Sequence, residues 1–175
     1  MSLFLSIMRT LGSVFVILVF CFLSVAAQDA RPQFEDYKVS RYQGRVHLPK
    51  WIQRSSSGEW RDDAGKLVDP PEVNFAGKYY IGSHSCRTGC RYYTMTDLSS
   101  GRELKALFPF STVEPPPKTR DGSEYLTILY YQADSKMLVA QYLIDLGREC
   151  RERAFLFENG RVKPITKTRR SCSTF

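Results

Sequence analysis

The sequence is poor in the patterns that mark catalytic sites. It contains only two histidines, His47 and His84, and neither lies in a recognisable catalytic motif. Nucleophilic catalysis needs a base that a third group positions, so nothing nominates a hydrolase. The carboxylate pairs at 35–36 and 62–63 are adjacent along the chain, and neighbours on a strand point to opposite faces, which makes them poor glycosidase pairs. No catalytic residue and no cofactor is predicted.

The chain also lacks a helical hydrophobic period after residue 27, an internal repeat and a long low-complexity tract. What it contains instead is alternating, aromatic and β-branched segments separated by turn residues, which is typical of strands. The predicted strands are 78–83, 91–96, 102–108, 125–131, 136–144, 153–158 and 161–165, with short edge strands possible at 37–39 and 45–48.

Two features of these segments predict how they associate. Segments 125–131 and 136–144 are apolar on both faces, which favours a central position in a sheet. Asn159-Gly160 is a strong hairpin signal between the last two segments. We therefore expect an all-β domain, an antiparallel meander of about seven to nine strands that closes as a small barrel or a sandwich.

The amino-terminal segment has the layout of a secretory signal peptide. Arg9 precedes an apolar run from Leu11 to Leu23, and small residues then lead to a predicted cleavage site after Ala27. The alternative is an uncleaved membrane anchor, but Leu11 to Ala27 is 17 residues, short of the roughly 20 that span a bilayer. The remaining 148 residues (175 minus 27) suit one domain, with an irregular segment 28–72 packed on a β-rich core 73–175. We expect a periplasmic or secreted protein without stable membrane insertion.

Four of the five cysteines follow the predicted cleavage site, and an even number in an exported chain indicates two disulfides. Of the three possible pairings, we expect Cys86–Cys90 and Cys150–Cys172. Gly89 allows the tight loop of the first pair, and the second ties down the tail. A zinc site that combines His84 with cysteines and a redox-active Cys86–Cys90 loop are weaker alternatives, because the spacing matches neither kind of motif.

Part of the sequence resembles a family of exported proteobacterial proteins of unknown function. The resemblance rests on Asn74-Phe75-Ala76-Gly77-Lys78-Tyr79, on Cys86-Arg87-Thr88-Gly89-Cys90, and on the turn from Asp97 to Gly101. In that family the cysteine loop reads G-C-G-x-G-C, whereas this chain has Ser85-Cys86-Arg87 at its start. The resemblance implies export and a shared fold, and it brings no activity, substrate or cofactor.

Positive charge is the most one-sided feature of the chain. The formal charge of +7 falls to +6 when Arg9 leaves, and residues 161–175 contain five cations and no acid. Such a surface favours acidic partners, although a charge run is often only a solvated face. The predicted binding residues are His84, Arg87 and Arg91 around the cysteine loop, extended by Arg169 and Arg170.

These observations lead to two hypotheses. The first is a non-enzymatic binding protein that recognises a protein or an anionic envelope polymer, with nucleic acid an improbable ligand outside the cell. The second is an envelope enzyme or thiol-redox factor centred on His84 and the Cys86–Cys90 loop. The oligomeric state and the identity of the partner do not follow from the sequence.

Overall fold

The computed structural model describes residues 31–87, 90–112 and 115–175, without the side chain of Arg87. The predicted signal peptide 1–27 lies outside these residues, as does its cleavage site. Residues Gln33–Phe175 form one compact unit. No helix in the described part of the chain is long and apolar enough to cross a membrane.

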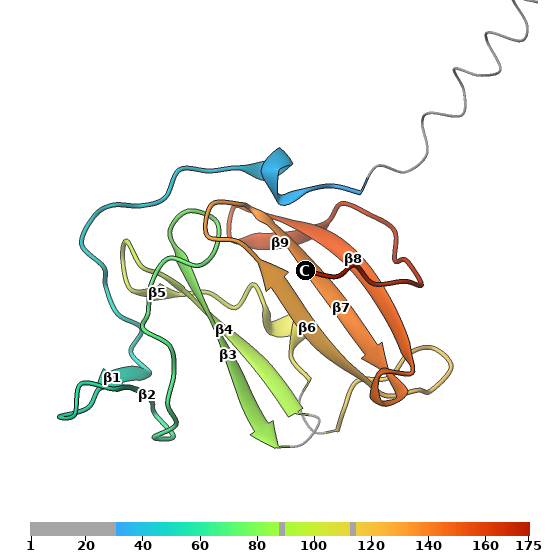
Figure 1. The fold of residues 1–175 in the computed structure, drawn as a ribbon, viewed down its shortest axis with the longest axis horizontal. Helices are drawn as coiled ribbons and strands as arrows, with labels where there is room; N and C mark the ends of the chain where they lie inside the picture. The colour runs from blue at the N-terminus through green and yellow to red at the C-terminus, as the bar shows by residue number, and fades with distance from the viewer. Residues whose placement is uncertain (1–30, 88–89, 113–114) are drawn as a thin grey trace, which may run out of the picture. The chain divides into compact units, whose positions relative to one another are not determined.

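The secondary structure is almost entirely antiparallel β-structure, as predicted (Figure 1). The strands are β1 (Ile52–Arg54), β2 (Trp60–Asp62), β3 (Tyr79–Arg87), β4 (Cys90–Asp97), β5 (Arg102–Glu103), β6 (Tyr125–Tyr131), β7 (Met137–Ile144), β8 (Glu149–Glu158) and β9 (Arg161–Pro164). The 3₁₀ turns are η2 (Phe34–Tyr37), η3 (Phe108–Phe110) and η4 (Asp145–Gly147). The strands form three sheets, in the orders β1-β2, β3-β4-β5 and β6-β7-β8-β9, and none of them closes into a barrel within the described residues.

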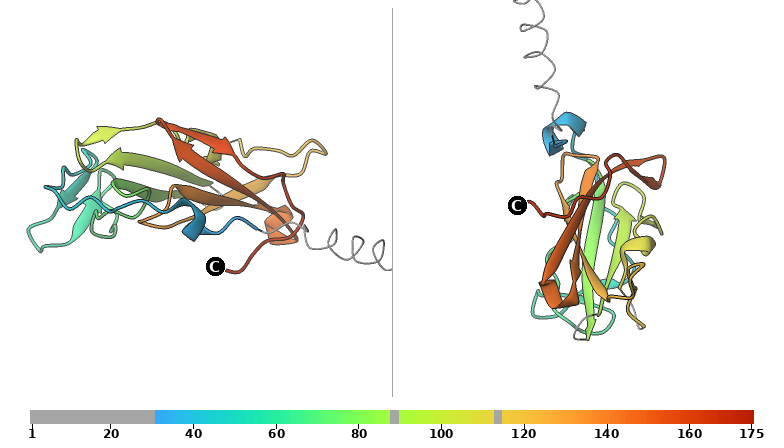
Figure 2. Two further views of the ribbon diagram at one scale, coloured as in Figure 1. Left: turned by 90° about the horizontal axis from the view of Figure 1, so that it is seen from above. Right: turned by 90° about the vertical axis from the view of Figure 1, so that its right-hand side faces the viewer.

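The two larger sheets share one hydrophobic core, and Figure 2 shows them in edge view. Ile81 and Met95 on the β3-β4 hairpin meet Leu138 and Phe155 on the longer sheet, and all four are buried. The predicted alternation is therefore confirmed, because Ile81, Tyr93 and Met95 point into the core while their neighbours point away.

Predictions for four segments were wrong. The return strand 102–108 is only the two residues of β5, because the chain turns at Pro109 in η3 to bury Leu107 and Phe110. Segment 45–48 forms no strand, and segment 37–39 contributes only one isolated bridge, from Lys38 to Ser135. Strand β6 lies at the edge of its sheet and not at its centre, which β7 occupies with β8.

The Asn74-Phe75-Ala76-Gly77 segment is a tight turn before β3, and the amides of Ala76 and Gly77 donate hydrogen bonds to the loop between β6 and β7. The Asn74 side chain accepts a hydrogen bond from the Ile81 amide at 2.7 Å and donates one to its carbonyl at 3.0 Å. Phe75 is fully buried, and Gly77 has a φ of +78°. A Cβ on Gly77 would lie 2.4 Å from the Ser40 carbonyl oxygen, so glycine is required there. The motif thus has a structural role.

Each large sheet has a second face, which the ends of the chain cover. Over β3-β4, the segment that carries β1 and β2 contributes Ile52, Trp51 and Trp60. Over β7-β8, Phe34 of η2 packs on Met137, Val139 and Ala154, and Phe175 stacks on Tyr130 with ring centroids 4.6 Å apart.

Candidate functional site

His84 lies in a hollow of about 420 Å³ on the second face of the β3-β4 hairpin. The other lining residues are Lys50, Trp51, Asp63, Tyr92, Thr94 and Glu103. Antiparallel register explains why the sheet residues meet. His84 is opposite Tyr92, Gly82 is opposite Thr94, and Glu103 of β5 is opposite Thr96 on the same face.

The imidazole of His84 is held between two aromatic rings. It stacks on Tyr92 with ring centroids 4.5 Å apart and an angle of 10° between the planes. Trp51 approaches it edge-on at 4.6 Å and also stacks on Tyr80 at 6.0 Å. These contacts fix the orientation of Trp51 and Tyr92, which form the aromatic part of the hollow.

His84 also connects two polar side chains. Its Nε2 lies 2.9 Å from the Thr94 hydroxyl, and its Nδ1 lies 3.9 Å from an Asp62 carboxylate oxygen. His84 is only 7% exposed, and this burial lowers its pKa, which the negative charges of Asp62 and Asp63 partly oppose. The ring is therefore neutral near pH 7.

Gly82 leaves the space that this cluster fills. A Cβ at Gly82 would lie 2.5 Å from the Trp51 ring, 2.7 Å from the Thr94 hydroxyl and 3.0 Å from His84 Nε2. Any larger residue would displace the tryptophan, so this glycine allows the β1-β2 segment to approach the hairpin closely. The Trp51 Nε1 donor is buried there and has no hydrogen-bond acceptor in the part of the chain that the structure describes.

The structure separates the predicted binding residues. Arg87 ends β3 opposite Cys90, but its side chain lies outside the described part of the structure. Burial raises the pKa of Tyr93, and a hydrogen bond with Arg91 partly opposes this rise. Arg91 therefore shares a face with Tyr93 and lies on the opposite side of the hairpin from His84. Arg169 and Arg170 lie on the carboxyl-terminal tail, which covers the other sheet.

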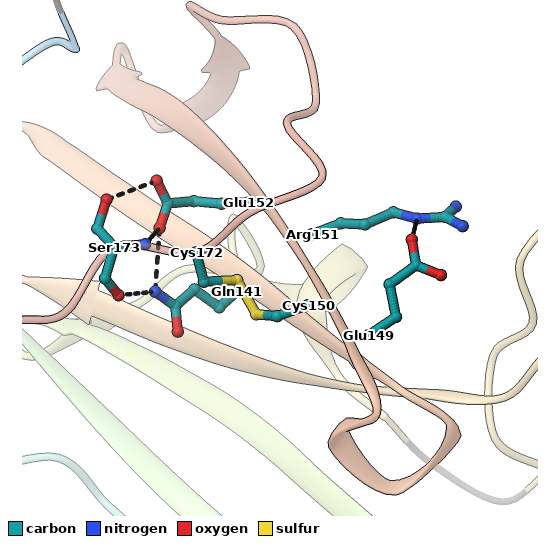
Figure 3. The surroundings of a disulfide bond; sticks show 7 residues. All are labelled: Gln141, Glu149, Cys150, Arg151, Glu152, Cys172 and Ser173. Atoms are coloured by element: carbon teal, nitrogen blue, oxygen red, sulfur yellow. Dashed lines mark hydrogen bonds and ion pairs between the residues drawn. A yellow bond between two sulfur atoms is a disulfide. The ribbon is translucent and has the colours of Figure 1, made fainter.

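The tail is fixed at several points (Figure 3). Arg169 exchanges two backbone hydrogen bonds with Glu152, and Cys172 is bonded to Cys150. The buried Glu152 carboxylate accepts hydrogen bonds from the Ser173 amide at 2.7 Å, the Ser173 hydroxyl at 3.0 Å and Gln141 at 3.0 Å. This buried charge is therefore stabilised by neutral donors, and each of them lies on or under the tail.

Several cations lie close to this anchor in the sequence. Arg151 donates to Glu149 at 2.6 Å, which lowers the pKa of Glu149, and the positive charge of Arg170 adds to this effect. Arg170 and Lys167 are exposed, as are Arg161 and Lys163 on β9. None of these four has a salt bridge among the described residues.

Both predicted disulfides are present, Cys86–Cys90 and Cys150–Cys172. The four cysteines are therefore not available as thiolate zinc ligands. No cluster of three or more potential metal ligands occurs in the described ranges.

Several residues of the hollow had no clear signal in the sequence. The alternation in 91–96 could have placed Thr94 on the same face as Tyr92. Lys50, Asp63 and Glu103 lie in polar segments, and only the tertiary packing of β1-β2 and β5 brings them to His84.

Comparisons with known proteins found no match to this chain among family models, curated proteins or solved structures.

Proposed function

We propose that this chain is an exported, non-enzymatic binding protein that recognises a protein or an anionic envelope polymer through its basic tail surface. The basic tail surface consists of the exposed Arg161, Lys163, Lys167 and Arg170. The half-buried Arg169 lies between Lys167 and Arg170 in the sequence. The observation that carries the proposal is the fixed backbone beneath these cations. Cations on a rigid surface lose less conformational entropy when they bind than those on a loose tail.

The two disulfides support a compartment outside the cytoplasm, periplasmic or extracellular. Cleavage of the signal peptide after Ala27 is part of the same proposal. The shared core of the two large sheets supports a sandwich-like architecture over a barrel. Membership of the exported family that the Asn74–Gly77 motif resembles is part of the same proposal.

The proposal is tested with the full chain, produced by export and with both disulfides oxidised. It is immobilised and exposed to isolated envelope fractions and to sodium polygalacturonate at low and moderate salt. We expect the double variant Lys167→Glu, Arg170→Glu to lose at least about tenfold in affinity, because each reversal replaces attraction to the ligand by repulsion.

A matched control carries the same change in net charge elsewhere, Arg45→Glu with Lys105→Glu, at two exposed positions away from the tail. Equal losses in both double variants would show that only overall charge matters and would refute the assignment to the tail. Absence of any captured protein or polymer at low salt would refute the binding proposal itself.

A second candidate function is an enzyme centred on His84, and one observation favours it. Asp62, His84 and Thr94 stand in the order acid, imidazole and hydroxyl, and the ring is neutral, as a general base must be. A thiol-redox role would instead use Cys86, which is exposed. Saturable hydrolysis of p-nitrophenyl acetate that Thr94→Val abolishes would favour the enzyme, and equal rates in both proteins would exclude this triad.

A further inference from the structure

The hollow around His84 is separate from the basic tail surface, since the two lie on the second faces of different sheets. Its lining combines aromatic rings with charged side chains. Trp51 and Tyr92 are half-exposed, and Lys50, Asp63 and Glu103 are exposed. None of these three charged groups forms an ion pair or a side-chain hydrogen bond with another described residue.

The charges of the lining restrict the ligand. With His84 neutral, the hollow carries two carboxylates and one ammonium group. A phosphate or carboxylate would meet the carboxylates of Asp63 and Glu103, and an ammonium group would meet Lys50. Because the carboxylates outnumber the ammonium group, a simple anion is disfavoured, and an uncharged ligand rich in hydroxyl groups is favoured over a simple cation because it can bond to all three charged groups at once. Carboxylates accept strong hydrogen bonds from hydroxyl donors, and ammonium groups donate them.

The aromatic rings add a second restriction. Tyr92 has His84 against one face, and its hydroxyl has no hydrogen bond among the described residues. A rigid aromatic ring with a polar tip suits a ligand that has an apolar face and a polar rim. A pyranose ring meets this description, because its C–H groups form a flat apolar face and its hydroxyl groups surround it. The volume of about 420 Å³ lies within the range of small-molecule sites, about 300–1,000 Å³.

We propose that the hollow lined by Trp51, Tyr92 and Glu103 binds an uncharged pyranose unit of an envelope polysaccharide. Tyr92 packs on the sugar face, Glu103 and Asp63 accept hydrogen bonds from its hydroxyl groups, and Lys50 donates to them. This inference rests on the proposed binding function, and it names the chemistry of one part of the polymer. It adds a site that the basic tail surface does not include.

The test uses the full oxidised chain and two neutral probes, cellotetraose and chitotetraose, with tetragalacturonate and polyphosphate as charged comparisons. Binding is followed by calorimetry and by the fluorescence of the tryptophans. We expect a neutral probe to bind with little dependence on salt, because no net charge is neutralised. We expect Glu103→Gln and Tyr92→Leu each to weaken this binding by about tenfold, the loss of one charge-assisted hydrogen bond or one ring contact.

Two controls separate the site from a loss of folding. Glu158→Gln removes an exposed carboxylate elsewhere and is expected to leave sugar binding unchanged. Glu103→Gln lies at an exposed position on β5, so its unfolding midpoint should match that of the parent chain.

The outcomes distinguish this inference from the proposed function. Failure of both neutral probes to bind would overturn the pyranose site, and so would binding that Glu103→Gln and Tyr92→Leu leave unchanged. If the chain captured an envelope protein and Glu103→Gln abolished this capture, the hollow would be assigned to a protein ligand. This outcome would also overturn the pyranose site. If polygalacturonate still bound through Lys167 and Arg170, the proposed function would stand without the sugar site.

Discussion

The second faces of the two large sheets are covered in contrasting ways. Over β7-β8, a disulfide and a buried carboxylate hold the tail, and the donors around Glu152 are fully used. Over β3-β4, the β1-β2 segment has no covalent link and packs through aromatic rings around His84. The first covering is held covalently and its buried carboxylate accepts three hydrogen bonds, whereas the second leaves a hollow with exposed charged side chains and an indole donor that has no hydrogen-bond partner among the described residues.

This difference suggests a division between a supporting face and a recognition face. A buried carboxylate with all its hydrogen bonds made is rigid and has little capacity left for a ligand. The β1-β2 cover, which packs through Trp51, Trp60 and Ile52, leaves polar groups at its rim, and binding sites are usually built where such groups converge on an apolar surface. Three perturbations test how far the two faces differ.

The largest expected effect is the loss of the disulfide that holds the tail. Chain-entropy arguments assign about 3.4 kcal/mol to a loop of 23 residues, as between Cys150 and Cys172, and about 2.1 kcal/mol to the five-residue loop of Cys86–Cys90. We expect the double variant Cys150→Ala, Cys172→Ala to lose more free energy of unfolding than Cys86→Ala, Cys90→Ala, measured in urea. Equal losses would show that the tail contributes no more to stability than the hairpin loop.

The next effect concerns the cover over β3-β4. Gly82→Ala places a methyl group against Trp51 and Thr94, and overpacking of this kind costs about 1–3 kcal/mol. We expect a lower free energy of unfolding together with a shift in tryptophan fluorescence as the Trp51 ring moves. Ser85→Ala is the matched control, at an exposed position on the same strand. Unchanged fluorescence in Gly82→Ala would contradict the close packing of the β1-β2 segment.

The smallest effect is a dependence of stability on pH. Burial lowers the pKa of His84 in the folded state. The negative charges of Asp62 and Asp63 partly oppose this change, and the positive charge of Lys66 adds to it. Below about pH 6.5, the unfolded chain therefore binds a proton that the folded chain resists, so the free energy of unfolding falls as the pH falls. Between pH 7.5 and 5.5, His84→Gln should show a flatter profile than the parent chain. The control His47→Gln, at an exposed position, should retain the parent profile.

Much of the fold could be predicted because its strands carry local signals. Strands β6 to β9 were placed within a few residues, since β6 and β7 are long apolar segments and the Asn159-Gly160 turn joins β8 to β9. Strands β1 and β2 were missed. Each has three residues, mostly polar, so alternation has no room to appear, and apart from one bridge between Arg61 and Leu67 they pair with one another. The position of β6 at an edge depends on sheet order, which one segment does not encode.

The candidate site was harder to predict than the fold. The proximity of His84 to the cysteine loop suggested a shared surface with Arg91, but alternation along β3 and β4 places the two side chains on opposite faces. Burial of His84 depends on Trp51, more than 30 positions earlier, and on the absence of a side chain at Gly82. Such contacts arise from packing between distant segments, which composition and spacing do not report.

The network around Glu152 has a consequence for how the protein is made. A chain emerges from its amino end, so Glu152 and Gln141 appear before Ser173, which follows them by 21 and 32 positions. Until Ser173 arrives, the carboxylate lacks two of its three donors and is better left in water than buried in the sheet. Native packing of β7 and β8 therefore waits for the tail, and a chain interrupted before Ser173 would be exposed to proteases as an unfinished product.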